Sequence, residues 1–261
     1  MTTPPASLPI AFSPAAPATQ PAHEPWAMSV QQRLYVWLTA FSVACLLIAD
    51  IVGIKLFHIP LPFKLFGYDA IEHTCGMLTF PVTFLLTDLI NEYYGAKGAR
   101  RVTYIGLAMA AFVFVIMNLA QWMPYLDAPF NIKQESFDAV FGSAKLMYVA
   151  SMAAYLVGQL ADIAVFKALK RATGGKLLWL RATGSTVISQ FLDSFVVSYI
   201  AFGIGKTMTG QTGATFPEVL KIAATGYTLK FVLAVCITPL IYLGRGILHR
   251  WFGLIPAPPG A

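Results

Sequence analysis

The chain has 261 residues, of which 57% are apolar and only 11% are charged, and its formal net charge is +6. In an ordinary soluble domain about a quarter of all residues are charged. A chain this apolar cannot present a hydrated exterior in water. The composition therefore excludes a soluble enzyme, a nucleic-acid-binding domain and a disordered chain, and it predicts a protein that resides in a lipid bilayer.

The first 30 residues differ in composition from the rest of the chain. They contain seven prolines, no lysine and no arginine. A signal peptide needs a basic start and a continuous apolar core, whereas this composition is typical of a disordered tail. We therefore divide the chain into a Pro/Ala-rich tail (1–30), a transmembrane domain (31–250) and a short C-terminal tail (251–261).

Long apolar segments follow the tail, and each can supply the roughly 20 residues that a membrane-spanning helix needs. Pro81 and Pro239 lie inside two of them and predict local kinks, and no strand is expected. The sequence thus predicts an all-α, polytopic membrane protein with six transmembrane helices, at residues 33–57, 74–94, 101–123, 144–169, 183–205 and 217–243.

Basic residues at the segment ends predict the orientation of these helices, because lysine and arginine collect on the cytoplasmic side. One side has six: Lys55, Lys64, Lys133, Lys145, Lys206 and Lys221. The other side has eleven: Arg33, Lys97, Arg100, Arg101, Lys167, Lys170, Arg171, Lys176, Arg181, Arg245 and Arg250. Both termini are therefore expected to be cytoplasmic, which agrees with an even number of helices.

Ionisable residues inside the apolar segments need an explanation, because each costs about 2.5–3.5 kcal/mol at the centre of a membrane helix. Such residues are expected to face the bundle interior, a water-filled cavity or one another. The residues in question are Asp50, Asp88, Asp162, Asp193 and Lys230.

Amides accompany three of these carboxylates at helical spacing, where residues three or four apart are neighbours. Gln159 shares a face with Asp162, Gln190 shares a face with Asp193, and Asp88 shares a face with Asn91 and Glu92. The segments GQLADIAVF (158–166) and SQFLDSFVV (189–197) also resemble each other, as faint internal repeats in transporters do. Polar side chains can simply hold membrane helices together, and Lys230 could merely neutralise an aspartate. Packing, however, does not require carboxylates, so we favour a function for Asp162 and Asp193.

The residue types indicate the ligand chemistry. Glutamine and asparagine offer donors and acceptors, and a carboxylate accepts two parallel N–H bonds. This combination suits a planar ring with N–H and C=O edges, such as a guanine-like base or an amide. An inorganic anion would need arginine or backbone N–H groups, and glutamine is a poor ligand for Mg²⁺. No metal, cofactor or nucleophile motif is evident, and Cys45, Cys75 and Cys236 have no paired spacing. Cys45 and Cys236 are expected to pack inside helices.

Several motifs resemble those of the queuosine precursor transporters, also called the vitamin uptake transporter family. They are LTFPVTFLLTDLINEYYGAKGARR (78–101), ADIVGIKLF (49–57), VGQLADIAVFKALK (157–170), WLRATGSTVISQFLDSFVVSYIAF (179–202), and Lys230 followed by Thr238, Pro239 and Tyr242. The resemblance covers nearly all of residues 34–243.

The resemblance implies a non-enzymatic importer in the bacterial inner membrane. Its substrates would be 7-cyano-7-deazaguanine and 7-aminomethyl-7-deazaguanine, the precursors of the tRNA nucleoside queuosine. The expected partners are this small base and the lipid bilayer, without nucleic acid or cofactor. Two alternatives stay open: a substrate-binding subunit that needs a separate energising module, and a structural membrane protein without a substrate.

The same polar faces would carry the transport function. We expect Gln159, Asp162, Gln190 and Asp193 to recognise the base, with Asp50 and Lys230 in the same site. Asp88, Asn91 and Glu92 are expected to shape the inner gate or to carry a coupling proton.

Overall fold

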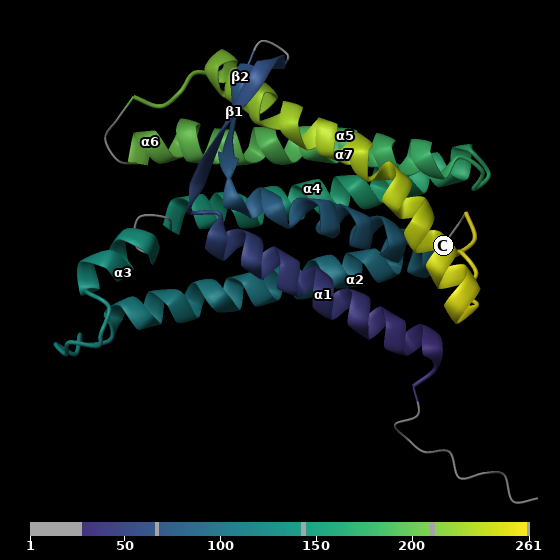
Figure 1. Ribbon diagram of the computed structural model, residues 1–261, viewed down its shortest axis with the longest axis horizontal. Helices are drawn as coiled ribbons and strands as arrows, with labels where there is room; N and C mark the ends of the chain where they lie inside the picture. The colour runs from purple at the N-terminus through teal and green to yellow at the C-terminus, as the bar shows by residue number, and fades with distance from the viewer. Residues whose placement is uncertain (1–27, 66–67, 142–144, 209–211, 260–261) are drawn as a thin grey trace, which may run out of the picture.

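The computed structural model describes residues 28–65, 68–141, 145–208 and 212–259, so nearly all of the predicted N-terminal tail lies outside the described part. The structure is mostly helical (Figure 1). Its long helices are α1 (Val30–Val52), α2 (Phe80–Trp122), α4 (Lys145–Ala172), α5 (Leu178–Ser198) and α7 (Phe216–Phe252). Shorter elements are the 3₁₀ turn η1 (Cys75–Leu78), α3 (Gln134–Phe141), the π-helical segment η2 (Tyr199–Ile204) and α6 (Gly205–Met208).

By length and composition, five helices in the described part of the chain can cross a membrane, which confirms a polytopic membrane protein. They cover Val30–Val52, Phe80–Trp122, Gln134–Ala172, Leu178–Thr207 and Phe216–Phe252. The expected count of six is not confirmed in this form, because most of the predicted segment 74–94 and nearly all of 101–123 belong to one helix, α2. As one straight helix, α2 would be about 65 Å long, or about twice the hydrocarbon thickness of a bilayer.

Helix α2 is interrupted at Gly95, which has φ 67° and ψ −179°. This backbone conformation is open almost only to glycine. The chain doubles back within α2 (Figure 1), so that residues 80–94 and 96–122 form two legs. The Tyr35 hydroxyl donates to the Gly98 carbonyl and the Tyr94 hydroxyl donates to the Gln31 carbonyl, each over 2.8 Å. These two bonds hold the turn of α2 against the beginning of α1.

A β-hairpin follows α1, and the expectation of a chain without strands is wrong at this point. Strands β1 (Leu56–Leu65) and β2 (Tyr68–Thr74) pair antiparallel, from Leu56 opposite Thr74 to Pro60 opposite Ala70, with an irregularity before Leu65 pairs with Tyr68. Helix α1 ends at Val52 rather than at residue 57. Two prolines, Pro60 and Pro62, are incompatible with a helix interior, while the apolar residues around them suit a strand as well as a helix.

The two prolines expected to kink helices behave differently. Pro81 occupies the first turn of α2, where its missing N–H has no partner in any case. The expected kink at Pro81 is therefore wrong, and the break in α2 lies at Gly95. Pro239 does lie inside α7, which continues to Phe252 and ends on Gly253 with φ 63°. A left-handed glycine is a common end for a helix.

The bundle has a hairpin end and a tail end. The hairpin end contains β1, β2, α3, η2 and α6, and the tail end contains the turn at Gly95, the loop between α4 and α5, and residues 254–259 (Figure 1). Between them lies a core cluster of Phe84, Phe166, Leu178, Ala182, Ile237 and Ile241. Many large apolar side chains on the outside of the bundle are exposed, as a surface that faces lipid requires.

Candidate substrate-binding cavity

A cavity of about 510 Å³ opens among α1, α2, α4, α5 and α7. Leu56 and Thr74 of the hairpin and Phe202 of η2 belong to its lining, so the cavity lies toward the hairpin end. Its volume falls within the range of about 300–1,000 Å³ that is typical of small-ligand sites. Most of the lining is apolar, and its polar groups come from α1, α2, α4, α5, α7 and the end of the hairpin.

The structure brings five of the six predicted substrate-binding residues into the lining of this cavity. They are Asp50 from α1, Gln159 from α4, Gln190 and Asp193 from α5, and Lys230 from α7. The sixth, Asp162, does not line the cavity. It is buried between α4 and α5, where its Oδ1 accepts a hydrogen bond of 3.2 Å from the Ser189 hydroxyl.

Helices α4 and α5 pack together through the two segments that resemble each other. Asp162 contacts Ser189, and a side chain at Gly158 would lie 3.2 Å from Cβ of Asp193. Gly158 and Ser189 hold equivalent places in the two segments, as do Asp162 and Asp193. The contacts are therefore reciprocal, with each aspartate facing the small residue four positions before its counterpart. Because both positions are small, the two helices approach closely.

One side of the cavity carries an ion pair. The Lys230 ammonium donates to Asp193 Oδ2 over 2.5 Å and lies 4.8 Å from the centre of the Phe80 ring. The predicted role of Lys230 as a neutralising partner fits this geometry. An ammonium held between a carboxylate and an aromatic face keeps two favourable interactions away from bulk water.

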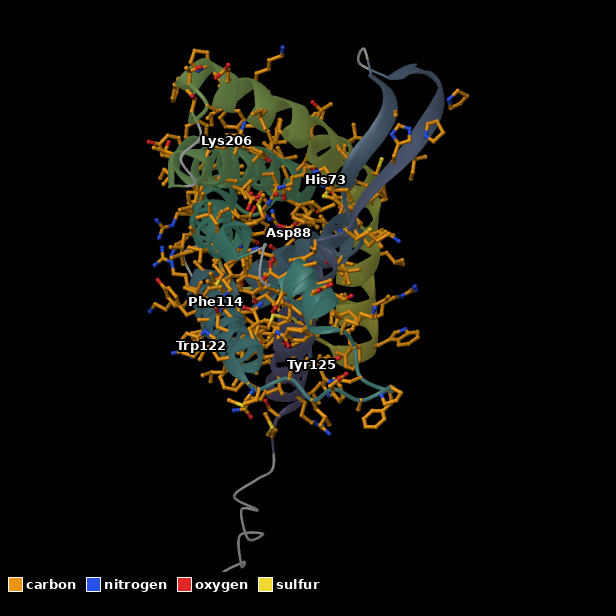
Figure 2. The ribbon with its side chains drawn as sticks, turned by 90° about the vertical axis from the view of Figure 1, so that its left-hand side faces the viewer. His73, Asp88, Phe114, Trp122, Tyr125 and Lys206 are labelled. Carbon is orange, nitrogen blue, oxygen red and sulfur yellow. The ribbon has the colours of Figure 1, made fainter. Side chains whose placement is uncertain are left out.

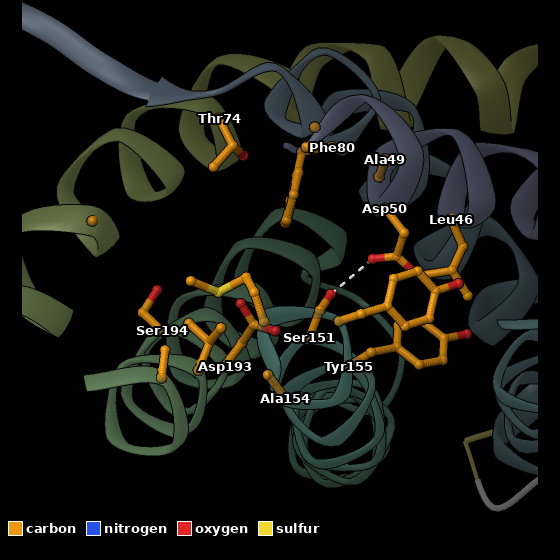
Figure 3. A pocket seen from close by; sticks show the side chains of 18 of the residues that line it. Leu46, Ala49, Asp50, Thr74, Phe80, Ser151, Ala154, Tyr155, Asp193 and Ser194 are labelled. Carbon is orange, nitrogen blue, oxygen red and sulfur yellow. Dashed lines mark hydrogen bonds between the residues drawn. The ribbon is translucent and has the colours of Figure 1, made fainter. Parts of the chain in front are cut away.

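The opposite side of the cavity carries a second carboxylate, Asp50. Its Oδ1 accepts a hydrogen bond of 2.8 Å from the Ser151 hydroxyl of α4. Figure 3 shows Asp50 with Ser151 and Tyr155 on one side of the cavity, and Asp193 with Ser194 on the other. Two carboxylates of different surroundings thus face one space.

Two polar atoms in the lining have no protein partner within the described residues. Gln190 Oε1 and the Ser194 hydroxyl are buried without a hydrogen bond. A buried polar atom without a partner costs about 1–3 kcal/mol, and most such atoms in proteins are satisfied. Two of them beside one carboxylate therefore indicate a place where a polar ligand supplies the missing bonds.

His73, at the base of the hairpin, also lines the cavity (Figure 2). Burial, assisted by the nearby positive charge of Lys230, lowers the pKa of His73 to about 4. Its Nδ1 accepts a bond of 2.9 Å from the backbone N–H of Thr74. The imidazole is therefore neutral near pH 7 and adds no charge to the cavity.

The predicted gate residues lie away from the cavity, toward the tail end. Glu92 is buried and pairs with Arg181 over 2.7 Å and with Lys170 over 3.0 Å. Its backbone carbonyl accepts from Lys170 over 3.0 Å and from the N–H of Ala257 over 2.8 Å. Arg181 was expected at a hydrated loop, but its side chain is fully buried, because the chain folds it onto Glu92.

Asp88 and Asn91 lie on the same leg of α2 as Glu92, and both are buried (Figure 2 labels Asp88 inside the bundle). Asp88 lies within electrostatic range of the charged groups of Asp162, Glu92 and Arg181. Asp88 Oδ1 and Asp162 Oδ2 have no hydrogen-bond partner among the described residues. The two carboxyl groups form a polar layer between the cavity and the charged cluster at the tail end.

Sequence reasoning missed Ser151, Tyr155 and Ser194, which lie in the lining with the predicted residues. The signal that could have found Ser151 and Tyr155 is helical spacing, since they share the face of α4 that carries Gly158, Gln159 and Asp162. Ser194 follows Gln190 by four residues in the same way. One further expectation is wrong: Cys45 is buried, but Cys236 is exposed on the outside of α7.

Long apolar helices around a ligand-sized cavity with unpaired polar atoms define a multi-pass membrane protein with a candidate small-ligand site. The family model described as "Putative vitamin uptake transporter" matches residues 74–244. The chain belongs to this family, and it is a protein of the bacterial plasma membrane.

Three curated relatives agree with this assignment. A protein of Bacillus subtilis named "Probable queuosine precursor transporter" is 28% identical over 82% of this chain and 84% of its own length. A protein of Haemophilus influenzae with the same name is 28% identical over 66% of this chain and 71% of its own length. The "Queuosine precursor transporter" of Escherichia coli is 29% identical over 64% of this chain and 67% of its own length. No solved structure matches the chain.

Proposed function

We propose that this protein imports the queuosine precursors 7-cyano-7-deazaguanine and 7-aminomethyl-7-deazaguanine across the plasma membrane. The observation that carries the proposal is the pair of unsatisfied buried atoms, Gln190 Oε1 and Ser194 Oγ, beside the carboxylate of Asp193 in a cavity of ligand size. Acceptors of this kind complement the ring N–H and amino groups of a guanine-like edge. The names of the three relatives support the same substrate class.

Within this proposal, Gln159, Gln190 and Asp193 recognise the edge of the base that carries the amino group. Lys230 pairs with Asp193 until the base competes for the carboxylate. Asp162 acts from outside the cavity by holding Ser189, and thereby the position of Gln190, on α5. It is thus a positioning residue.

We further propose that the hairpin end faces the outside and that both termini are cytoplasmic. The eleven basic residues at the segment ends of the predicted inner side support this orientation. In this proposal each leg of α2 crosses the bilayer, so that six crossings place both termini on one side. Reporter fusions at Gly98 and Gly174 should then report the cytoplasm, and fusions at Glu135 and Gly213 the opposite side. The reverse pattern would contradict the orientation.

The cavity lies toward the hairpin end while charged pairs close the tail end, so the structure represents an outward-open arrangement in this proposal. Inward release then requires the cluster of Glu92, Lys170 and Arg181 to separate. Asp88 and Asp162 each have one carboxyl oxygen without a hydrogen-bond partner among the described residues, and they are the groups suited to take up a coupling proton between the two ends.

The decisive experiment uses the purified full chain in sealed proteoliposomes, without any other protein. We expect saturable uptake of both labelled precursors, whereas a substrate-binding subunit would bind them and release none into the lumen. In cells that cannot synthesise deazaguanines, expression should restore queuosine in tRNA when either precursor is supplied. A base without the 2-amino group should give no recovery above the transporter-free control. Failure of both precursors, with the protein present in the membrane, would refute the proposed substrates.

A further inference from the structure

The cavity has two anionic sites, but only one of them is neutralised by the protein. Asp193 is paired with Lys230 at 2.5 Å. In the described part of the chain, no lysine, arginine or histidine pairs with Asp50, whose one polar contact is the Ser151 hydroxyl. His73 is neutral near pH 7. Lys145, the other cation of the lining, begins α4 and lies about 9 Å along that helix from Ser151, at 1.5 Å per residue. The Asp50 side of the cavity thus has a carboxylate without a counter-charge among the described residues.

An unpaired carboxylate inside a membrane protein is costly, and such residues generally mark a ligand or ion pathway. The surroundings of Asp50 narrow the choice of ligand. Tyr155 lies beside it (Figure 3), and Tyr148 and Phe114 belong to the same lining. A carboxylate flanked by aromatic rings is a site for an ammonium group, which gains a charged hydrogen bond and attraction to the ring faces.

We propose that Asp50 and the adjacent Tyr155 form a subsite for a primary ammonium group, and that this subsite makes the protein prefer the cationic aminomethyl base to the neutral cyano base. The inference rests on the proposed function. The aminomethyl amine is protonated at neutral pH, like a lysine side chain with a pKa of about 10.4, whereas the cyano group carries no charge. Both bases share the ring edge that would face Gln190 and Asp193, so the two differ only in the substituent on the five-membered ring.

The positions of the two carboxylates fit this arrangement. In a 7-deazaguanine, the substituent at position 7 lies on the opposite side of the ring system from the 2-amino group. A base held by its amino edge on the Asp193 side therefore directs its substituent toward the Asp50 side, as Figure 3 places the two residues. The ammonium would replace the missing counter-charge, while the nitrile would leave Asp50 unpaired.

The test measures the ratio of aminomethyl-base to cyano-base uptake in proteoliposomes of the full chain. Asp50→Asn removes the charge and keeps the shape, and it should lower this ratio by about 10-fold to 100-fold, as expected for the loss of a hydrogen bond to a charged group. Asp127→Asn is the matched control, because Asp127 is exposed outside the cavity, and it should leave the ratio unchanged. Ser151→Ala removes only the hydrogen bond to Asp50 and should shift the ratio in the same direction by less.

The possible results separate this inference from the proposed function. Uptake of both bases by the unchanged protein, with the same ratio in Asp50→Asn and Ser151→Ala, would overturn the ammonium subsite and leave the proposed function intact. Equal loss of both bases in Asp50→Asn, with an unchanged ratio in Ser151→Ala, would also overturn it and would favour Asp50 as a proton site. Uptake of neither base by the unchanged protein would refute both.

Discussion

The cavity near the hairpin end and the charged cluster at the tail end are built from similar residues. The two regions differ in how far the protein itself pairs their polar and charged groups. Around Glu92, both cations and the backbone carbonyl are engaged, and Arg181 is fully buried. In the cavity, Gln190 Oε1 and the Ser194 hydroxyl have no partner among the described residues, and Asp50 has no counter-charge. The comparison indicates that charge alone does not locate a binding site in a membrane protein. The cavity differs in that its unpaired polar atoms lie beside an open volume, because buried atoms without a hydrogen bond also occur on Glu92, Arg181 and Asp88.

The largest expected effect concerns the charged cluster at the tail end, where both cations are paired with Glu92. Glu92→Gln leaves the cations of Arg181 and Lys170 buried without an anion, and removal of one partner from a buried ion pair costs about 3–5 kcal/mol. We expect a marked fall in the free energy of unfolding in detergent, measured by denaturant titration of the purified protein. Glu135→Gln, on the exposed surface of α3, serves as the control and should be neutral. A stable Glu92→Gln protein would mean that the cluster is not a structural closure.

The second-largest expected effect concerns the cavity and its carboxylates. Asp193→Asn should weaken binding of a 7-deazaguanine by about 1.5–3 kcal/mol, because the hydrogen bonds from the base would no longer reach a charged group. Asp162→Asn should weaken it less, since Asp162 lies outside the cavity and touches Ser189 instead. Binding isotherms of both variants in detergent provide the comparison. Equal losses of affinity in the two variants would show that lining the cavity gives Asp193 no greater role in binding than Asp162. Unchanged affinity in both variants would favour a packing role for the two aspartates.

A third prediction concerns the turn that brings the tail-end cluster together. Gly95→Ala forces a Cβ into a backbone conformation with φ 67°, which costs about 1–3 kcal/mol. The melting temperature of the purified protein should fall accordingly. Gly246→Ala is the matched control, because Gly246 lies within α7 with no atom near its added Cβ. It should be neutral or stabilising by up to about 1 kcal/mol. If both variants melted alike, the turn at Gly95 would not need its glycine.

The smallest effect lies outside both regions. Removal of residues 1–28 should leave membrane insertion and precursor uptake unchanged, because this segment has neither the basic residues nor the apolar periodicity of a targeting or membrane segment. Uptake per amount of membrane-embedded protein is the measurement. A loss at equal protein level would assign the tail a role in transport.

Much of the fold follows from apolar segment length alone. The five candidate spans overlap the six predicted segments, and the apolar exterior is a consequence of composition. The hairpin escaped prediction because Leu56 and Phe57 continue the apolar run of α1, and short apolar runs suit a strand as well as a helix. The position of the break in α2 also escaped it, since a glycine in a helical pattern does not show its φ angle.

The candidate site was predictable as a set of residues but not as a geometry. A carboxylate or amide in an apolar segment is conspicuous because of its cost in lipid, and five of the six predicted substrate residues line the cavity. The separation of Asp162 from Asp193 was not predictable, since both belong to the same local pattern. Only the antiparallel packing of α4 against α5 turns one toward the cavity and the other toward Ser189.

The sequence by itself determined that this protein is an α-helical membrane protein and which carboxylates and amides lie inside its apolar segments, because length, hydropathy and the cost of charge in lipid are local properties. The tertiary structure decided which of those residues are satisfied by the protein. Glu92 finds Lys170 and Arg181 across 78 and 89 residues of chain, and Asp193 finds Lys230 across 37. Asp50 accepts a hydrogen bond from Ser151 of α4, and no cation of the described residues pairs with its carboxylate. Such pairings depend on how distant helices pack, and no local pattern contains them.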